Sequence, residues 1–361
     1  MIIADIVSRL EVFAPQGLAL GWDNVGLQIG EKSWEVSKVL VTLDVTSTAI
    51  DKAIENGAKL IVSHHPLIFQ AVKSITNPSI IKLIQHKVAV ICLHTNYDVA
   101  KQSVNHALAK QLGLEVVATL SEETGAKNHH ITVFCPPSSV TAVSEAAWKA
   151  GAGNIGNYSN CATQHEVKGF FKAESGAKPY TIAAEETGIA ETALDFICDS
   201  FRLHSVLAAI RRAHPYETPL VYNHSIDFAN PSYGLGLVCK FNPAKTLGEI
   251  AHIVKTTLKC PQLKLWTADT EIDSVIDTIA ICGGSGGSLL KTAEEKAQLF
   301  ISGDISYHSF LDSRIPLIDA GHFYTEYPAL EKLNSLMDEL GLDSSVLPIQ
   351  QHEYCRKMQI L

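Results

Sequence analysis

The segment Lys59-Leu-Ile-Val-Ser-His-His-Pro66 decides the fold, because an apolar run ends abruptly there in two histidines and a proline. A short β-branched run of this kind is typical of a buried strand. Two similar runs flank it, at 39–45 and 88–93, and helical patterns at about 47–57 and 78–86 separate the three. A further helical pattern follows at about 102–112. This alternation predicts parallel strands that are joined by helices.

The same alternation returns near the end of the chain. The predicted strands there are 275–282, 298–302 and 315–319, and the predicted helices are about 288–295, 306–312 and 326–340. We expect the two stretches to form one α/β domain, with a mixed or parallel sheet flanked by helices.

The residues between these stretches have a different pattern of strand-like and helical segments. Strand-like runs occur at 130–135, 164–172, 180–185, 193–198 and 220–226, and helical patterns at 138–149 and 203–212. This is approximately βαββαβ, the order of a ferredoxin-like unit. We therefore predict a discontinuous α/β domain, residues 1–124 and 235–361, interrupted by an insertion over 125–234.

Composition excludes several classes of protein. The 361 residues are 46% hydrophobic and 19% charged, which is the mix of a globular chain rather than a disordered one. A net charge of −9 and no run of five basic residues disfavour nucleic acid as a partner. No apolar run approaches the ~18 residues of a membrane helix.

The eight cysteines are scattered, and the two closest in sequence, Cys239 and Cys260, are 21 residues apart. We see no secretory signal in the first residues, so we expect reduced thiols and a cytoplasmic protein.

Polar side chains of one chemical kind follow the predicted strands. They are His64, His65, His94, Asp98, Asp304, His308, Asp319, His322 and Glu326. Because the carboxyl ends of parallel strands meet at one edge of a sheet, these groups should converge there. Imidazole and carboxylate together suit Zn²⁺, Mn²⁺, Fe²⁺ or Co²⁺, and two such ions about 3.5–4 Å apart can activate water.

The pattern has further implications. Adjacent histidines on an extended segment point in opposite directions, so His64 and His65 would serve two ions more naturally than one. His322 and Glu326 have the i,i+4 spacing that places both on one helix face. Taken singly, each feature also has an ordinary structural explanation: a solvated His-His pair, a helix-dipole glutamate, or an Asx turn at Asp98.

Three other motifs are less specific. The segment Gly283, Gly284, Ser285, Gly286 and Gly287 is a candidate anion-binding loop, with a tight packing turn as the equal alternative. His214-Pro-Tyr-Glu217 follows a predicted helix, where packing and capping explain it better than metal binding. We interpret the pair His129-His130 as structural.

Six segments together resemble the GTP cyclohydrolase 1 type 2 homolog family, also called the Nif-three-like family. They are GWDNVGLQIG at 21–30, SHHPLIF at 63–69, HTNYD at 94–98, GGSGG at 283–287, SGD at 302–304 and DAGHFYTE at 319–326. The resemblance spans nearly the whole chain. The insertion with HPYE resembles the PII/CutA-like domain of the longer bacterial members.

The resemblance implies a site of two divalent metal ions per subunit, zinc foremost, with Mn, Fe or Co as alternatives. Its ligands would be His64, His65, Asp98, His322 and Glu326, with Glu326 contacting both ions. His94, Asp304 and His308 match family positions around the metals, where we expect supporting or proton-transfer roles. The resemblance also implies a homohexamer, a trimer of dimers, with the insertions covering its openings.

The resemblance further implies hydrolysis of a nucleotide or related heterocycle, with GTP ring opening and formate release as the named candidate. Two alternatives stay open at this point. One is a non-catalytic metal-binding oligomer with a regulatory or ligand-sensing role, and the other is a dimetal phosphoesterase that clamps a phosphate.

Overall fold

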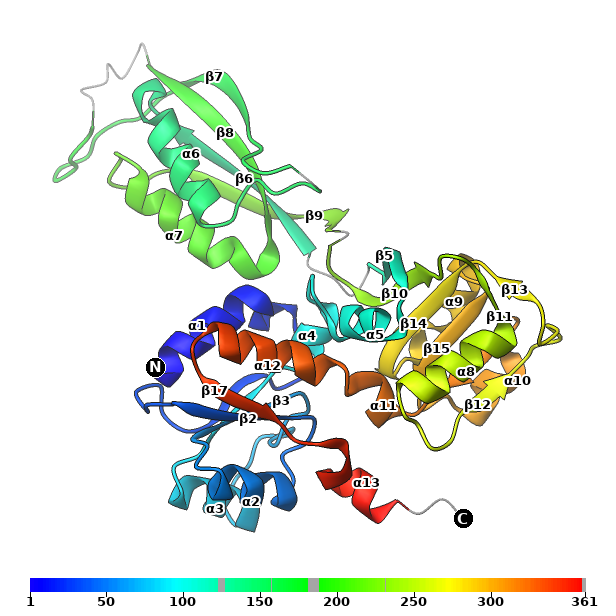
Figure 1. Cartoon of the computed structure of the whole chain (residues 1–361). Helices are drawn as coiled ribbons and strands as arrows, with labels where there is room; N and C mark the ends of the chain where they lie inside the picture. The colour runs from blue at the N-terminus through cyan, green and yellow to red at the C-terminus, as the bar shows by residue number, and fades with distance from the viewer. Residues whose placement is uncertain (123–126, 157, 181–187, 231, 359–361) are drawn as a thin grey trace. The chain divides into compact units, whose positions relative to one another are not determined.

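The chain divides into two compact units in the computed structural model (Figure 1). The first unit comprises Met1–Thr124 and Tyr233–Leu361, and the second comprises Gly125–Ser232. The structure describes all residues except 123–126, 157, 181–187, 231 and 359–361. Each unit is described by itself below.

The first unit contains a five-stranded mixed sheet in the order β1-β4-β3-β2-β17. Its strands are β1 (Gly26–Ile29), β2 (Lys38–Thr42), β3 (Leu60–Ser63), β4 (Ala89–Cys92) and β17 (Asp343–Val346). Strands β17, β2, β3 and β4 are parallel, and β1 runs antiparallel to β4. The decisive apolar run is thus the central strand, and its four residues are fully buried.

Helices cover both faces of this sheet (Figure 1). On one face α2 (Ser47–Glu55) and α3 (Pro78–Gln85) pack through apolar side chains such as Ile50 and Leu83 against Leu40 and Ile61. On the other face lie α1 (Ile3–Phe13) and α12 (Ala329–Glu339). Burial on both faces explains why the strands read as continuous apolar runs without alternation.

A second mixed sheet of the same unit has six strands in the order β12-β16-β15-β14-β10-β5. They are β12 (Lys264–Trp266), β16 (Leu317–Asp319), β15 (Leu299–Gly303), β14 (Ile279–Ser285), β10 (Leu235–Lys240) and β5 (Glu115–Ser121). Strands β14, β15 and β16 are parallel and the others antiparallel to their neighbours. Four helices lie near this sheet in Figure 1: α5 (Val104–Leu112), α8 (Leu247–Thr257), α9 (Leu290–Lys296) and α10 (Tyr307–Asp312).

The prediction of a single sheet is therefore wrong, although the mixed α/β class is confirmed. Both edges of the first sheet are occupied by strands that sequence analysis left unassigned, β1 beside β4 and β17 beside β2. The second stretch of the chain consequently builds its own sheet, whose antiparallel strands β5, β10 and β12 were also unassigned. A pair of two-residue strands, β11 (Lys245–Thr246) and β13 (Val275–Ile276), completes the unit's strands among the described residues.

Two short helices precede helices that the sequence predicts. The pattern at 326–340 becomes α12, which the separate helix α11 (His322–Glu326) precedes, and Pro328, which has no backbone N–H to donate, stands at the start of α12. The region before α5 forms an extra short helix, α4 (Thr95–Val99). Short 3₁₀ turns lie at Gln16–Leu18, Gly287–Leu289 and Ile349–Gln351, and α13 (Glu353–Lys357) ends the described elements.

The second unit is a four-stranded antiparallel sheet in the order β7-β8-β6-β9. Its elements in sequence are β6 (Lys127–Cys135), α6 (Val140–Lys149), β7 (Thr163–Gly169), β8 (Ile189–Asp199), α7 (Leu203–Ala213) and β9 (Val221–Ala229). Short 3₁₀ turns precede both helices, at Pro137–Ser139 and Ser200–Arg202. The βαββαβ order agrees with the ferredoxin-like pattern of the sequence. Of the strand predicted at 180–185, residues 181–185 lie outside the described residues, and Tyr180 is not in a strand.

Helices α6 and α7 cover one face of this sheet. Apolar side chains such as Val143 and Ile210 pack there against Ile131 and Phe196. The opposite face carries Phe134, Glu191 and Tyr222, and neither of the helices described in this unit packs on it (Figure 1).

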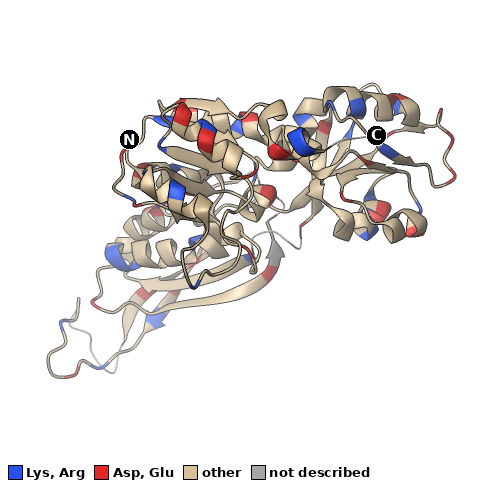
Figure 2. Ribbon diagram, turned by 90° about the horizontal axis from the view of Figure 1, so that it is seen from below, with Lys and Arg blue, Asp and Glu red and all other residues tan. Residues whose placement is uncertain are grey.

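The structure agrees with the expectation that the cysteines are unpaired. All eight cysteines are free, and six of them are buried. Lys and Arg alternate with Asp and Glu along the helices in Figure 2. Within the described residues, no helix combines the length and apolar character that a bilayer crossing requires.

Candidate metal centre

The parallel strands of the two sheets in the first unit have their carboxyl ends at one cluster of histidines and carboxylates. His64 and His65 follow β3 directly, and His94 follows β4. His322 and Glu326 come from α11, the helix that follows β16 of the other sheet. The strand-end rule therefore gathers these residues, but from two sheets rather than from one.

Glu326 is the centre of the cluster, and its side chain is only 6% exposed. Its Oε1 lies 3.6 Å from His64 Nε2, and that nitrogen is 3.7 Å from Asp98 Oδ1. Its Oε2 lies 3.0 Å from His65 Nε2 and 3.1 Å from His322 Nε2. The two carboxylate oxygens thus face two different sets of side chains.

Each of the four imidazole rings is held through its Nδ1 atom by an oxygen acceptor. His64 Nδ1 is 2.8 Å from the Leu93 carbonyl oxygen, and His65 Nδ1 is 2.8 Å from Asp44 Oδ1. Because a carbonyl or carboxylate oxygen only accepts, each Nδ1 carries the proton.

The other two rings follow the same rule. His322 Nδ1 donates to Asp304 Oδ2 at 2.7 Å, and His94 Nδ1 donates to Asp23 Oδ1 at 2.9 Å. Fixing the Nδ1 tautomer leaves the Nε2 lone pair of a neutral ring available as a ligand, which is the usual support of a metal-binding histidine.

Two inner polar atoms of the cluster have no hydrogen-bond partner among the described residues. His64 Nε2 and Glu326 Oε2 are both buried without a hydrogen bond, although ring nitrogens lie about them. Leaving such atoms unsatisfied is costly unless something else binds them. A divalent cation satisfies them all, because nitrogen and carboxylate oxygen donors suit zinc and its neighbours.

Two groups of side chains have ligand atoms that all lie within 4.8 Å of one another. One group is His64, His65 and His94, and the other is His65, His322 and Glu326. These histidine and glutamate groups could therefore hold a metal ion.

Electrostatics also favour a cation at this position. Burial raises the pKa of Glu326, but His64, His322 and His65 more than offset this and hold it well below its ordinary value. Burial lowers the pKa of His65, whereas the hydrogen bond to Asp44 and the nearby Glu326 carboxylate raise it to about 10. The Glu326 carboxylate is consequently ionised. Without an ion the imidazole rings around it carry the compensating positive charge, and a bound divalent cation would take their place and release their protons.

Asp98 lies on α4 rather than in an Asx turn, and its Oδ1 faces His64. Burial raises the pKa of this carboxyl group. The structure thus brings all five proposed ligands into one cluster, with Asp98 on the Oε1 side of Glu326.

The three residues expected to support the metal site, His94, Asp304 and His308, lie in different places relative to the cluster. His94 joins the cluster, and Asp304 holds His322 from a left-handed backbone conformation with φ of 51°. His308 does not join it: the residue is exposed on α10, and its ring contacts that of Tyr307. A role for His308 next to these ligands is therefore not supported, since α10 turns its ring towards solvent.

The segment expected to bind an anion has most of its backbone N–H groups occupied. Gly283, Gly284 and Ser285 form the end of strand β14. The backbone N–H groups of Gly283, Gly284 and Gly286 already donate to side chains. The acceptors are Asn105 Oδ1 for Gly283, Thr325 Oγ1 for Gly284 and Ser302 Oγ for Gly286. These amides are not free to cradle an anion.

The glycines serve the cluster in another way. A Cβ atom on Gly284 would lie 2.1 Å from Glu326 Oε1, and the backbone there has φ of +67°. Only glycine permits both this conformation and this close approach. The segment is thus the packing element that leaves space for the Glu326 carboxylate.

Sequence reasoning missed Asp44 and Asp23, which hold His65 and His94. Asp44 follows strand β2 by two residues, so the strand-end rule already contained its signal. Asp23 accepts from the Thr95 backbone N–H at 3.0 Å as well as from His94, which gives the segment 21–30 its role.

Two histidines of the second unit, His214 and His130, contact other groups of the same unit. His214 Nε2 is 2.8 Å from the Phe134 carbonyl oxygen, and its Nδ1 accepts from the Tyr216 N–H. His130 Nε2 is 3.1 Å from Asp195 Oδ1 across the sheet. The packing role expected for His214 therefore agrees with these contacts.

Comparison with known proteins identifies the family. A family model described as Duf34/NIF3 (NGG1p interacting factor 3) matches residues 1–353. A Staphylococcus epidermidis protein named GTP cyclohydrolase 1 type 2 homolog is 35% identical over 348 residues, which cover 94% of this chain and 93% of that protein.

Two solved structures are similar over the whole chain. The Bacillus cereus protein related to NIF3 has a TM-score of 0.82 at 30% identity and covers 98% of each chain. The Staphylococcus aureus protein SA1388 has a TM-score of 0.75 at 30% identity and covers 100% of this chain and 99% of that one. On this evidence the chain belongs to the Duf34/NIF3 family.

Proposed function

We propose that this chain is a metal-dependent hydrolase with two divalent ions per subunit, which acts on a nucleotide or related heterocycle. The observation that carries the proposal is the set of histidines whose Nδ1 atoms are all anchored by oxygen acceptors around the buried Glu326. A cluster that merely stabilised the fold would have no need to leave buried donor atoms without a partner.

The ligands divide into two sets about Glu326. His64 and Asp98 lie on the Oε1 side, and His65 and His322 lie on the Oε2 side. In the proposed site each set would hold one ion, zinc foremost, and the Glu326 carboxylate would contact both. Five protein ligands for two ions would leave coordination positions for water and substrate.

Bound ions of this kind would supply Lewis acidity and activate water for attack on an electrophilic carbon or phosphorus atom. The chain's own residues orient the site: Asp44 and Asp304 fix the rings of His65 and His322. Asp23 fixes His94, and we propose that the ring of His94 takes up and releases the proton that hydrolysis moves.

GTP ring opening with release of formate is the first reaction to test. Its support is that the curated relatives bear the name GTP cyclohydrolase 1 type 2 homolog, together with the ligand set above. The same ligand set could act on a phosphate ester, so a phosphoesterase is tested beside it.

The test combines metal analysis with turnover. Wild type, His65→Ala and the control His86→Ala, an exposed histidine at the end of α3, are purified without chelators and analysed for bound metal. Each is then incubated with GTP while formate and phosphate are measured. We expect bound metal and formate release for wild type and for His86→Ala, and loss of both for His65→Ala.

The alternatives give other results. Phosphate without formate would support the phosphoesterase. Metal-loaded protein that releases neither product would contradict both hydrolases and favour the non-catalytic metal-binding oligomer. Protein that binds neither zinc nor manganese would overturn the assignment of the site.

We further propose that the second unit is a PII/CutA-like domain and that the chain assembles as a homohexamer. The support for the domain is the βαββαβ order with its β7-β8-β6-β9 sheet and the motif His214-Pro-Tyr-Glu217. The homohexamer is what the resemblance to the family implies. Light scattering coupled to size-exclusion chromatography should give a mass of about six chains. A monomer or dimer would contradict the assembly.

A further inference from the structure

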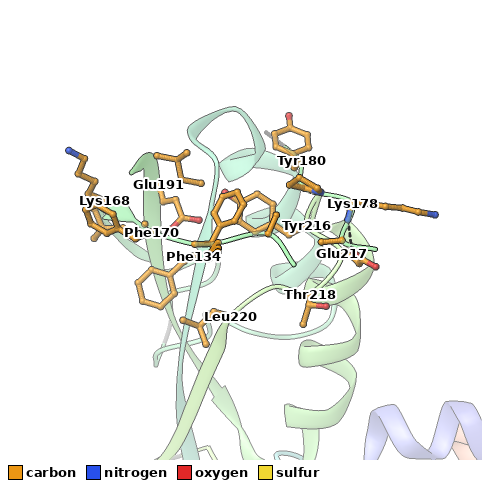
Figure 3. A pocket seen from close by; sticks show the side chains of 18 of the residues that line it. Phe134, Lys168, Phe170, Lys178, Tyr180, Glu191, Tyr216, Glu217, Thr218 and Leu220 are labelled. Atoms are coloured by element: carbon orange, nitrogen blue, oxygen red, sulfur yellow. Dashed lines mark hydrogen bonds between the residues drawn. The ribbon is translucent and has the colours of Figure 1, made fainter. Parts of the chain in front are cut away.

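A cavity of about 570 Å³ lies in the second unit, at one end of the sheet face opposite α6 and α7 (Figure 3). It is bounded by β6 to β9, by the segment after β7 and by the segment 216–220 that precedes β9. This volume is in the range of small-molecule sites, and no residue of the metal centre lines it.

Aromatic rings form much of the wall. The rings of Phe134 and Tyr222 meet edge to face with centroids 5.6 Å apart, and those of Tyr180 and Tyr216 are 6.0 Å apart. Phe170 adds a further ring from the segment after β7. The faces of such rings are electron-rich and attract cations.

A carboxylate lies among these rings. Glu191 projects from β8 beside Phe134 and Tyr216 (Figure 3). A Cβ atom on Gly169 would lie 2.0 Å from Glu191 Oε2, so the neighbouring strand β7 makes room for the carboxylate by having no side chain there. The Glu191 side chain therefore packs against the backbone of β7 at Gly169.

The hydroxyl group of Tyr216 belongs to the wall beside Glu191. It is buried and has no hydrogen-bond partner among the described residues. Burial and then the nearby Glu191 carboxylate raise the pKa of this hydroxyl, so it stays protonated and uncharged. Glu191 therefore supplies a negative charge to the wall, next to an uncharged Tyr216.

The lysines of the wall are placed differently. Lys168, Lys172 and Lys178 are all exposed, whereas Glu191 is half-buried. Lys168 lies over the ring of Phe170, with its Nζ 5.8 Å from the ring centroid, and the side-chain ends of Lys168 and Lys178 extend away from the cavity (Figure 3). Among the charged residues that line the cavity only Glu191 is half-buried, whereas the three lysines and Glu217 are exposed.

We propose that this cavity binds an organic ammonium cation that carries an aromatic or apolar body. The Glu191 carboxylate would accept a charge-assisted hydrogen bond from the ammonium group, and the surrounding rings would stabilise its charge. Leu220 and Ile189 provide apolar surface for the remainder of the ligand. This site is independent of the metal centre and of its proposed chemistry.

Three probes of nearly one shape test the sign of the recognised charge. They are phenethylamine (a cation), 2-phenylethanol (neutral) and phenylacetate (an anion), titrated into the full chain by calorimetry and by ligand-observed NMR. We expect phenethylamine to bind at least about tenfold more tightly than 2-phenylethanol, because only the amine forms a charge-assisted bond. Phenylacetate should bind most weakly of the three.

Variants assign the effect to Glu191. Glu191→Gln retains the size of the side chain and removes its charge, so the preference for the amine over the alcohol should disappear. The control Glu166→Gln removes an exposed carboxylate of β7 that does not line the cavity, and its preference should equal that of wild type. Circular dichroism and thermal melting establish that both variants are folded.

A second variant keeps the test decisive if Glu191→Gln fails to fold. Phe134→Leu removes one ring of the wall while retaining apolar volume, and it should weaken amine binding more than alcohol binding. The proposal is overturned if phenylacetate binds as tightly as phenethylamine, if no probe binds, or if folded Glu191→Gln still prefers the amine.

Discussion

At the scale of single residues, the candidate centre depends on the partners of its histidines as much as on the histidines. Each Nδ1–H donates to an oxygen, and two of these oxygens belong to Asp44 and Asp23, whose roles sequence analysis missed. Glu326 in turn depends on the absence of a side chain at Gly284. These dependences lead to two predictions.

Asp44→Asn should weaken metal binding by about 10-fold to 100-fold, the usual effect of losing a carboxylate that orients a metal-binding histidine. The asparagine retains the size of the side chain but not the charge that holds His65 Nδ1–H. Competition with a chromophoric chelator measures the affinity. The matched control is Asp51→Asn, which removes a surface carboxylate paired with Lys82, and equal weakening in both variants would contradict the prediction.

Gly284→Ala should destabilise the protein by about 1–3 kcal/mol, because the added methyl group overpacks the Glu326 carboxylate. It should also reduce the bound metal, since that carboxylate is displaced. Gly287→Ala is the control, because a Cβ there meets no atom within 4 Å. Denaturant unfolding and metal analysis measure the two effects, and normal metal content in Gly284→Ala would contradict the second.

At the scale of elements, a buried carboxylate joins α9 to the segment that leads into β16. Glu294 is 6% exposed, and it accepts hydrogen bonds from the Arg314 backbone N–H at 2.8 Å and from its guanidinium at 2.9 and 3.1 Å. Burial raises the pKa of Glu294, but the Arg314 backbone and side chain more than offset this and hold it below its ordinary 4.5.

A lowered pKa in the folded state means that ionised Glu294 contributes stability above pH 4.5, and that this contribution is lost as the pH falls through the folded-state value. Glu294→Gln should therefore lower the free energy of unfolding at pH 7 and flatten its decline below pH 4.5. Urea unfolding across this range measures both. Glu295→Gln, an exposed neighbour on α9, is the control, and an unchanged pH profile in Glu294→Gln would contradict the prediction.

At the scale of the whole molecule, the second unit is inserted where the chain would otherwise turn back on itself. Strands β5 and β10 are antiparallel neighbours, and Ser121 pairs with Leu235 across them. The two strands therefore have the geometry of a hairpin whose connection is replaced by a folded unit.

Replacing residues 122–234 with the turn Asn-Gly should consequently yield a folded chain. We expect it to bind metal with the affinity of the full chain and to have lost phenethylamine binding, because the cavity lies wholly in the second unit. Circular dichroism and the two titrations measure these outcomes. A shortened chain that does not fold would show that the first unit depends on the second.

The local pattern of the sequence was sufficient for the elements that carry the site. The apolar runs before His64 and His94 predicted β3 and β4, and the end of each strand predicted where ligands gather, since strand and turn preferences act over a few residues. The i,i+4 spacing of His322 and Glu326 was also readable, and α11 spans exactly this interval in the structure.

Only the tertiary structure decided how these elements combine. Short edge strands such as β1 and β17 have little periodicity of their own, so the division into two sheets could not be read from it. Glu326 faces His65 across 261 positions of the sequence because distant segments pack together. The same packing brings Asp44 to His65 and Asp23 to His94. The sequence by itself thus determined which side chains stand at strand ends, and the packing of the two sheets decided which of them meet.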